Sequence, residues 1–271
     1  MTQTAIIAGA GALPAALVSA LPTRPLVAAL EGYSPEGLLP DQVFRVERLV
    51  PFLNYLLDLG ITGVCFAGAV QRPNLDPSLF DPQTAQMVPR LLAAMQGGDD
   101  ATLREVLAIF EESGLKIVGA TEIAPDLTPS AGVLTGTVTA QDEADATRAS
   151  AIVAALGAVD VGQGAVVQAG LCLAVEALSG TDAMLANVAQ IPEDLRPKTA
   201  KGLLFKAPKP GQDRRIDLPT FGPHTLELVA KAGLGGIAFE AGGVIMLDRA
   251  ATVAQAQTLG LFLWARPLVT L

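Results

Sequence analysis

Histidine, cysteine and aromatic residues are scarce in this sequence of 271 residues. The one histidine, His224, stands at the start of an expected helix and is assigned to the surface, so we exclude a histidine-based triad and a multi-histidine zinc site. Cys65 and Cys172 lie in apolar segments that read as buried strands, and two cysteines favour reduced thiols in the cytoplasm over a disulfide. Aromatics make up 4% of residues and hydrophobic residues 51%, so the apolar mass is aliphatic, which is typical of an α/β fold.

Charge and apolar runs limit the partners. The formal net charge of −9 makes nucleic acid an unsuitable partner and opposes non-specific attachment to an anionic membrane. The uncharged stretch Met1 to Thr23 is interrupted by glycines and prolines and lacks the basic region of a signal peptide, and other uncharged runs fall short of the ~20 residues of a membrane span. Seven of the 18 basic residues lie between positions 196 and 215, which makes this stretch the candidate for peripheral contact with a membrane.

The apolar spacing predicts two α/β domains, 1–130 and 131–271. The first alternates short apolar strands with helices, as βαβ units do, and prolines and glycines between Pro125 and Gly136 mark the connection. We expect strands at 4–8, 25–30, 63–67 and 116–119 and helices at 13–21, 49–59 and from about 103 to Gly114. In the second domain we expect helices at 141–156, 181–188, 225–232 and 250–259 and strands at 165–168, 171–175, 236–240 and 244–247, followed by a last apolar run at 261–265.

Two loops of the first domain follow strands, where open α/β sheets bind ligands. The turn that runs from Gly9 to Pro14, through Ala12 and Leu13, leads into a helix whose first N–H groups are free to bind an anion. It lacks the third glycine of the dinucleotide fingerprint, so a tight structural turn is an equal alternative. The loop from Gly68 to Pro73, with Val70 and Gln71, is the second candidate, and its alternative is an ordinary surface loop.

Two further motifs lie in the second domain. Gln163 stands between two glycines directly before a strand, where the backbone can approach a ligand closely and the amide can donate and accept hydrogen bonds. Glu176 ends a strand, and the next helix opens with Gly180, Thr181 and Asp182. The alternatives are a β-turn with a solvated glutamine and a simple helix cap.

The segment from Lys206 to Thr220 is the densest in charge. It holds four cations, among them Lys209, and two carboxylates in a proline-stiffened loop, which suits a diphosphate together with a divalent metal. Asp217 lies between Ile216 and Leu218, so we expect a partly buried carboxylate at the end of a strand. A solvated basic loop is the alternative. Glu240, at the end of another strand, is either a site residue or an exposed hairpin glutamate.

Six motifs in order resemble the UDP-2,3-diacylglucosamine pyrophosphatase family of the lipid A pathway, from about residue 5 to residue 264. They are AGAGALP, CFAGAVQRP, DVGQGAVV, EALSGTDAM, KAPKPGQDRRIDLPT and EAGG. Each motif alone is modest, but six in order across nearly the whole chain are specific. The first departs from the family in having AGAG where a glycine triplet is more usual.

The resemblance implies a Rossmann-like N-terminal domain, a C-terminal α/β domain of unusual topology, and a substrate chamber between the two. It implies Mg²⁺-dependent hydrolysis of UDP-2,3-diacylglucosamine to UMP and 2,3-diacylglucosamine 1-phosphate (lipid X), with water attacking the α-phosphorus. The family's essential metal-associated aspartate falls on Asp217. Its ligand contacts fall on Ala12, Leu13, Val70, Gln71, Gln163, Glu176, Gly180, Thr181, Asp182, Lys206 and Lys209.

Other functions remain as alternatives. The AGAG turn is compatible with an NAD(P)-binding oxidoreductase, and the same motifs would also serve a UDP-lipid-binding protein without activity. For the hydrolase we expect peripheral contact with the cytoplasmic face of the inner membrane, and assembly into a homodimer is left open.

Overall fold

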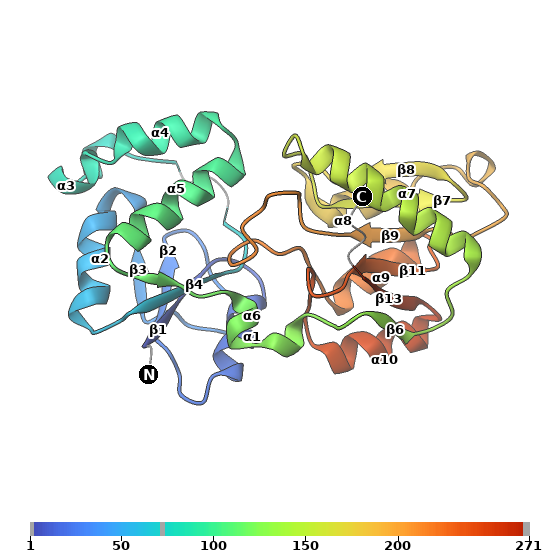
Figure 1. Ribbon diagram of the computed structural model, residues 1–271, viewed down its shortest axis with the longest axis horizontal. Helices are drawn as coiled ribbons and strands as arrows, with labels where there is room; N and C mark the ends of the chain where they lie inside the picture. Colours follow the sequence, from blue (N-terminus) through green and yellow to red (C-terminus); the bar gives the residue numbers. More distant parts are fainter. Residues whose placement is uncertain (1–2, 71–73, 268–271) are drawn as a thin grey trace. The chain divides into compact units, whose positions relative to one another are not determined.

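The computed structural model describes residues 3–70 and 74–267, and the chain divides into two compact units, Met1–Pro125 and Asp126–Leu271 (Figure 1). The sequence placed the division at residue 130. Each unit has its own sheet and its own apolar core. The two are therefore described separately.

The first unit is built on a five-stranded parallel sheet in the order β3-β2-β1-β4-β5. This is the strand order of nucleotide-binding α/β folds, and the order reverses between β1 and β4. The strands are β1 (Thr4–Ala8), β2 (Val27–Leu30), β3 (Gln42–Phe44), β4 (Gly63–Ala67) and β5 (Lys116–Ile117). The helices are α1 (Leu13–Ala20), α2 (Leu49–Asp58), α3 (Pro82–Ala85), α4 (Val88–Gln96), α5 (Asp99–Glu112) and α6 (Ala120–Ile123).

The second unit has a six-stranded mixed sheet in the order β6-β13-β11-β9-β7-β8 and a separate parallel pair, β10 and β12. The strands are β6 (Gly132–Thr135), β7 (Gly164–Gln168), β8 (Leu171–Val175), β9 (Leu203–Lys206), β10 (Thr220–Phe221), β11 (Gly236–Glu240), β12 (Ile245–Met246) and β13 (Phe262–Arg266). The helices are α7 (Ala140–Gly157), α8 (Gly180–Ala189), α9 (Pro223–Lys231) and α10 (Arg249–Leu259). Strands β9, β11 and β13 are parallel to one another, whereas β7 runs antiparallel to both β8 and β9.

Both faces of this sheet are covered, because successive strand residues point to opposite sides. On one face, α7 packs its small residues Ala146 and Ala149 against Val167 and Phe205. On the other face, α8, α9 and α10 enclose a larger aliphatic core that includes Val166, Leu204, Ile237, Leu185 and Leu226. Strands buried on both faces explain the high aliphatic content of the sequence.

The two-domain α/β fold is confirmed, but the structure corrects several details. The sequence missed β3, β6, β9, β10, the short helix α6 and the helical segment α3–α4. Asp217 is half-buried as expected, but it lies in the loop before β10 and not at a strand end. Cys172 is exposed on the outer strand β8, whereas Cys65 is buried, and both thiols are free. Within the described part of the chain, no helix is long and apolar enough to cross a membrane.

Candidate functional site

Strand register brings three predicted site residues to one end of the second unit's sheet. Gly164 at the start of β7 pairs with Lys206 at the end of β9. On its other side, the carbonyl oxygen of Gly164 accepts a hydrogen bond from the backbone N–H of Glu176, at 2.8 Å. Because β7 is antiparallel to both neighbours, its beginning meets the two strand ends. Gln163, Glu176 and Lys206 are thus gathered by the sheet itself.

The glycines around Gln163 are required by Glu176. A Cβ atom at Gly162 would lie 2.0 Å from the carbonyl oxygen of Glu176, and one at Gly164 would lie 2.6 Å from its carboxylate Oε2. The sequence interpretation had these glycines admitting a ligand. In the structure the absence of a side chain at Gly162 and Gly164 allows Glu176, which directly follows β8, to pack against them.

Lys206 is a buried cation at the centre of this end of the sheet, and its side chain is only 5% exposed. Its Nζ donates hydrogen bonds to Thr181 Oγ1 at 2.7 Å and to the carbonyl oxygen of Thr220 at 3.2 Å. Thr181 Oγ1 in turn donates to Glu176 Oε2 at 2.9 Å, and Lys206 Nζ lies 3.7 Å from that oxygen. Burial lowers the pKa of Lys206, and the negative charge of Glu176 opposes this effect. Such a buried and constrained amine is suited to meet an anionic group.

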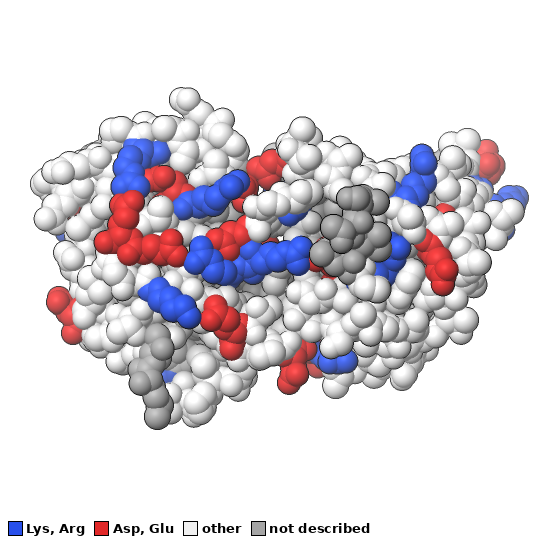
Figure 2. Space-filling model, in the orientation of Figure 1, with Lys and Arg blue, Asp and Glu red and all other residues white. Residues whose placement is uncertain are grey.

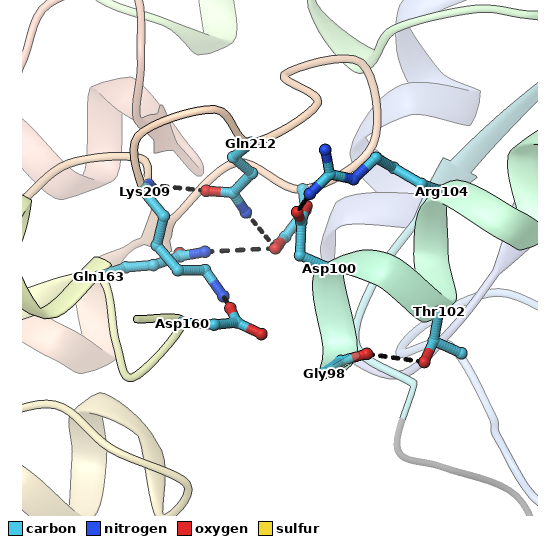
Figure 3. Close-up of polar contacts among 9 residues, drawn as sticks. Gly98, Asp100, Thr102, Arg104, Asp160, Gln163, Lys209 and Gln212 are labelled. Atoms are coloured by element: carbon cyan, nitrogen blue, oxygen red, sulfur yellow. Dashed lines mark hydrogen bonds and ion pairs between the residues drawn. The ribbon is translucent and has the colours of Figure 1, made fainter. Parts of the chain in front are cut away.

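Two amides donate hydrogen bonds to Asp217, and Figure 3 labels both donors, Gln163 and Gln212. Asp217 Oδ2 accepts one hydrogen bond from Gln163 Nε2 at 3.3 Å and a second from Gln212 Nε2. Burial raises the pKa of Asp217, while the Lys209 cation and the two amides act in the opposite direction. Lys209 donates from Nζ to Asp160 Oδ1 at 2.5 Å, so this cation is fixed beside the carboxylate.

A further ion pair anchors the loop that carries Asp217. Arg214 Nη1 lies 2.7 Å from Oε1 of Glu240, a residue at the end of β11 that is 8% exposed. A Cβ at Gly243 would lie 2.4 Å from the same oxygen, so the turn after β11 must be glycine to admit the carboxylate. Glu240 is therefore a buried anchor, and the alternative of an exposed hairpin glutamate is wrong.

Asp182 does not belong to this hydrogen-bonded group. Its side chain is 64% exposed, and its nearest recorded partner is His224 Nε2 at 3.6 Å. His224 is 70% exposed, as the assignment to the surface predicts. Gly180, at the start of α8, has a positive φ of 79°, which suits glycine and turns the chain from Glu176 into the helix.

The basic stretch from 196 to 215 is not a free basic patch, because five of its cations make internal contacts. Lys206 is buried, and Arg196 donates to the side chain of Gln168 and to the carbonyl oxygen of Ala232. On the face drawn in Figure 2, basic groups lie beside acidic ones. The other internal contacts are Lys209–Asp160, Arg214–Glu240 and Arg215–Asp213.

In the first unit, the two candidate loops pack on each other at the carboxyl edge of the sheet, where the strand order reverses. Ala10 and Ala69 exchange backbone hydrogen bonds of 2.8 and 2.9 Å. A Cβ at Gly9 would lie 2.5 Å from the Ala69 carbonyl oxygen, and one at Gly68 would lie 2.6 Å from that of Ala10. The glycines therefore serve loop packing, and the tight structural turn is an adequate explanation for them.

The predicted contacts in these loops lie near that edge. Ala12 occupies the N-cap position of α1, is exposed, and offers no side chain to the first N–H groups, which leaves them available to a ligand. Leu13 is half-buried and Val70 is 51% exposed. Gln71 lies outside the described residues.

The oxygen atoms available near Asp217 determine which metal ion the site could hold. Within residues 3–70 and 74–267, no group of three or more His, Cys, Asp or Glu side chains is placed to hold a metal. Asp217 is a single carboxylate flanked by amides, and Asp160 is engaged by Lys209. This set does not suit zinc, but it fits Mg²⁺, which takes one or two carboxylates together with substrate phosphates and water.

Sequence reasoning missed four members of the site: Asp160, Gln212, Arg214 and the carbonyl group of Thr220. Gln212 carried a usable signal, because it follows Pro210-Gly211, a turn dipeptide that returns the chain toward Lys209. No sequence signal pointed to Asp160, since its partner Lys209 lies 49 positions away in the chain.

Comparison with known proteins covers both units. The family described as LpxI N-terminal domain matches residues 3–127, and the one described as LpxI C-terminal domain matches residues 130–264. The UDP-2,3-diacylglucosamine pyrophosphatase LpxI of Caulobacter vibrioides is 41% identical over 271 residues, which cover 97% of this chain and 96% of that protein. The resemblance carried by the six motifs is confirmed.

Proposed function

Because the chain belongs to the LpxI family, we propose that it hydrolyses the pyrophosphate bond of UDP-2,3-diacylglucosamine in lipid A synthesis. The products are UMP and 2,3-diacylglucosamine 1-phosphate, or lipid X. The identity to the Caulobacter vibrioides pyrophosphatase extends over nearly the whole chain, which supports a shared reaction.

The observation that carries the proposal is a half-buried carboxylate with a buried and a half-buried cation at one end of the second unit's sheet. Asp217 is held by two amides, and Lys206 and Lys209 are both fixed by side-chain partners. A diphosphate is recognised by such constrained positive charge, and its cleavage needs an oriented oxygen ligand or acceptor close by.

We propose that Asp217, with substrate phosphate oxygens and water, holds Mg²⁺. The ion, when bound, supplies positive charge that offsets the charge developing on the phosphate and lowers the pKa of water. Gln163 and Gln212 keep the Asp217 carboxylate in place through its Oδ2. Lys209, fixed by Asp160, adds positive charge beside it.

Lys206 and Thr181 are assigned to the substrate. Lys206 Nζ has a third proton beyond those donated to Thr181 and Thr220, so it can donate to a phosphate oxygen without losing either bond. Glu176 orients Thr181 and balances the charge of Lys206. The loops at Ala12–Leu13 and at Val70 are assigned further ligand contacts.

The direction of attack is part of the proposal. Water that attacks the α-phosphorus leaves its oxygen in UMP, whereas attack on the other phosphorus leaves it in lipid X. Hydrolysis in water enriched in heavy oxygen, followed by mass spectrometry of both products, distinguishes them. We expect the label in UMP, and a label in lipid X would reverse the assignment.

Membrane contact is proposed to be peripheral and at the cytoplasmic face, because the substrate carries two acyl chains and no described helix can span a bilayer. Since the basic stretch is largely paired internally, we expect exposed apolar side chains to contribute, among them Leu178, which is fully exposed at 100%. Fractionation should release the protein from membranes without detergent. Homodimer formation stays a prediction.

The central experiment is incubation of the pure protein with radiolabelled UDP-2,3-diacylglucosamine and Mg²⁺. We expect UMP and lipid X in equal amounts, and no product in the presence of EDTA. Saturable binding of NADPH without UMP release would favour the oxidoreductase instead. Binding of the UDP-lipid without turnover would favour a carrier.

A further inference from the structure

Gln212 lies within the motif KAPKPGQDRRIDLPT, but the resemblance assigns it no role. It lies in the loop between Lys206 and Asp217, and its two ends meet different partners. Oε1 accepts a hydrogen bond from the backbone N–H of Lys209 at 2.8 Å, and Nε2 donates to Asp217 Oδ2. Figure 3 shows the amide oxygen of Gln212 facing Lys209 and its amide nitrogen facing away from Lys209.

The orientation of this amide is fixed by chemistry. A backbone N–H can only donate, so the group facing Lys209 must be the oxygen of Gln212. The NH₂ group is then turned toward Asp217, which as a carboxylate can only accept. Both contacts therefore require the same orientation of the amide.

The local sequence holds that orientation in place. Pro210 and Gly211 occupy the middle of a turn closed by the Gln212 N–H and the Lys209 carbonyl, at 3.2 Å, and Gly211 has a φ of 76°. This is the residue pattern of a type II turn. A Cβ at Gly157, the last residue of α7, would lie 2.7 Å from Pro210 Cδ, so the turn packs directly on the end of that helix.

The consequence concerns the two oxygens of Asp217. Oδ2 accepts both recorded amide donors, from Gln163 and Gln212, while Oδ1 accepts no hydrogen bond from the described residues. The carboxylate is thus held through one oxygen, and the other is left for an incoming ligand. Of the two donors, Gln212 is the one whose orientation is set by a turn.

We propose that Gln212 is a positioning residue: its locked amide holds one oxygen of Asp217 so that the other is presented to the phosphate-bound cation. This rests on the proposed hydrolysis and adds a residue to it. Because the role is exerted through Asp217 and not on the substrate, loss of the amide should lower kcat and leave substrate affinity unchanged.

Two variants separate this role from simple closure of the turn. Gln212→Glu keeps an acceptor for the Lys209 N–H but cannot donate to Asp217 when both carboxyl groups are ionised, at about pH 8. Gln212→Met has a similar length and loses both contacts. Gln255→Glu is the matched control, because Gln255 Nε2 also donates to a carboxylate, Glu227 Oε1 at 3.1 Å, on the surface.

We expect both Gln212 variants to lower kcat by about 10- to 100-fold, the range for a misplaced catalytic group, while Gln255→Glu stays within about twofold of wild type. Substrate Kd for Gln212→Met, measured calorimetrically in EDTA, should stay within about threefold, and its melting temperature should stay near that of wild type. Near-normal turnover by Gln212→Glu with loss in Gln212→Met would reduce the role to turn closure and overturn the proposal.

Two other outcomes would also overturn it. Near-normal kcat in both variants would show that Asp217 needs no such support, and a rise in Kd that matches the fall in kcat would make Gln212 a substrate contact. Wild-type protein in the same assay distinguishes failure of the proposed hydrolysis from failure of the role assigned to Gln212. If wild type released no UMP, the proposed function would be wrong and this inference would be wrong with it.

Discussion

Asp217→Asn is the substitution that tests the site most directly. Asparagine has nearly the same shape as aspartate, and its carbonyl oxygen can still accept from Gln163 and Gln212 in the place of Oδ2. The NH₂ group then occupies the position of Oδ1, where it repels a cation instead of binding it. The fold and the hydrogen bonds are kept, and the charge is removed.

The expected loss of activity is large. Removal of one principal electrostatic contribution to a transition state lowers kcat by ~10²–10³, which corresponds to ~2.7–4 kcal/mol, and loss of the metal would lower it further. Substrate affinity should change little, because Lys206, Thr181 and Lys209 keep their partners.

The thermal stability of Asp217→Asn should be equal to or higher than that of wild type, although its activity falls. Burial raises the pKa of Asp217 above its ordinary value of 3.8. At neutral pH the ionised carboxylate therefore disfavours the folded state. As the pH falls through the raised pKa toward 3.8, the folded protein takes up the proton before the unfolded chain does, and this destabilisation is relieved. Asp217→Asn should melt at or above the temperature of wild type at neutral pH, with a difference that disappears near pH 3.8.

The assays are UMP release, substrate Kd in EDTA and thermal melting at several pH values. Asp213→Asn is the control, since Asp213 lies in the same loop and forms an ion pair with Arg215, of the kind that contributes ~0–1 kcal/mol. It should lose less than about tenfold in kcat. Turnover by Asp217→Asn near that of wild type, or inactivity caused only by unfolding, would refute the assignment, and Glu240 or Asp182 would be examined next.

Three further predictions concern packing, binding and thiol chemistry. Gly162→Ala should lower the melting temperature by several degrees, because its Cβ would lie 2.0 Å from the Glu176 carbonyl oxygen and overpacking costs ~1–3 kcal/mol; an unchanged melt would contradict this close approach. Lys206→Met should raise substrate Kd by about 10- to 100-fold in calorimetry, since hydrogen bonds to a charged group contribute ~1.5–3 kcal/mol, and an unaltered Kd would remove Lys206 from the binding residues. A thiol reagent should label exposed Cys172 in the native protein and Cys65 only after denaturation, because burial raises the pKa of Cys65 to about 12; rapid native labelling of both would contradict the burial.

The elements that sequence predicted well are those whose pattern is local. Strands such as Thr4–Ala8 and Gly63–Ala67 are short apolar runs between turn residues, and they were placed to the residue. The strand Leu203–Lys206 was missed although it lies inside the sheet, because its neighbours in sequence are basic and its apolar partners are far away in the chain. Burial of Lys206 could not be read from a segment whose composition resembles a solvated loop.

In the candidate site, too, the sequence predicted local features but not the contacts between distant segments. The motifs pointed to Gln163, Lys209 and Asp217 separately, since each is conspicuous in its own segment. What makes them a site is the set of contacts that cross 54 positions between Gln163 and Asp217 and 49 between Asp160 and Lys209. Those contacts depend on the antiparallel register of β7 with β9, and register is a property of paired strands that neither strand specifies alone. Gln212 is the exception: its turn is encoded within four consecutive residues, so of the missed residues it alone could have been inferred before the fold was known.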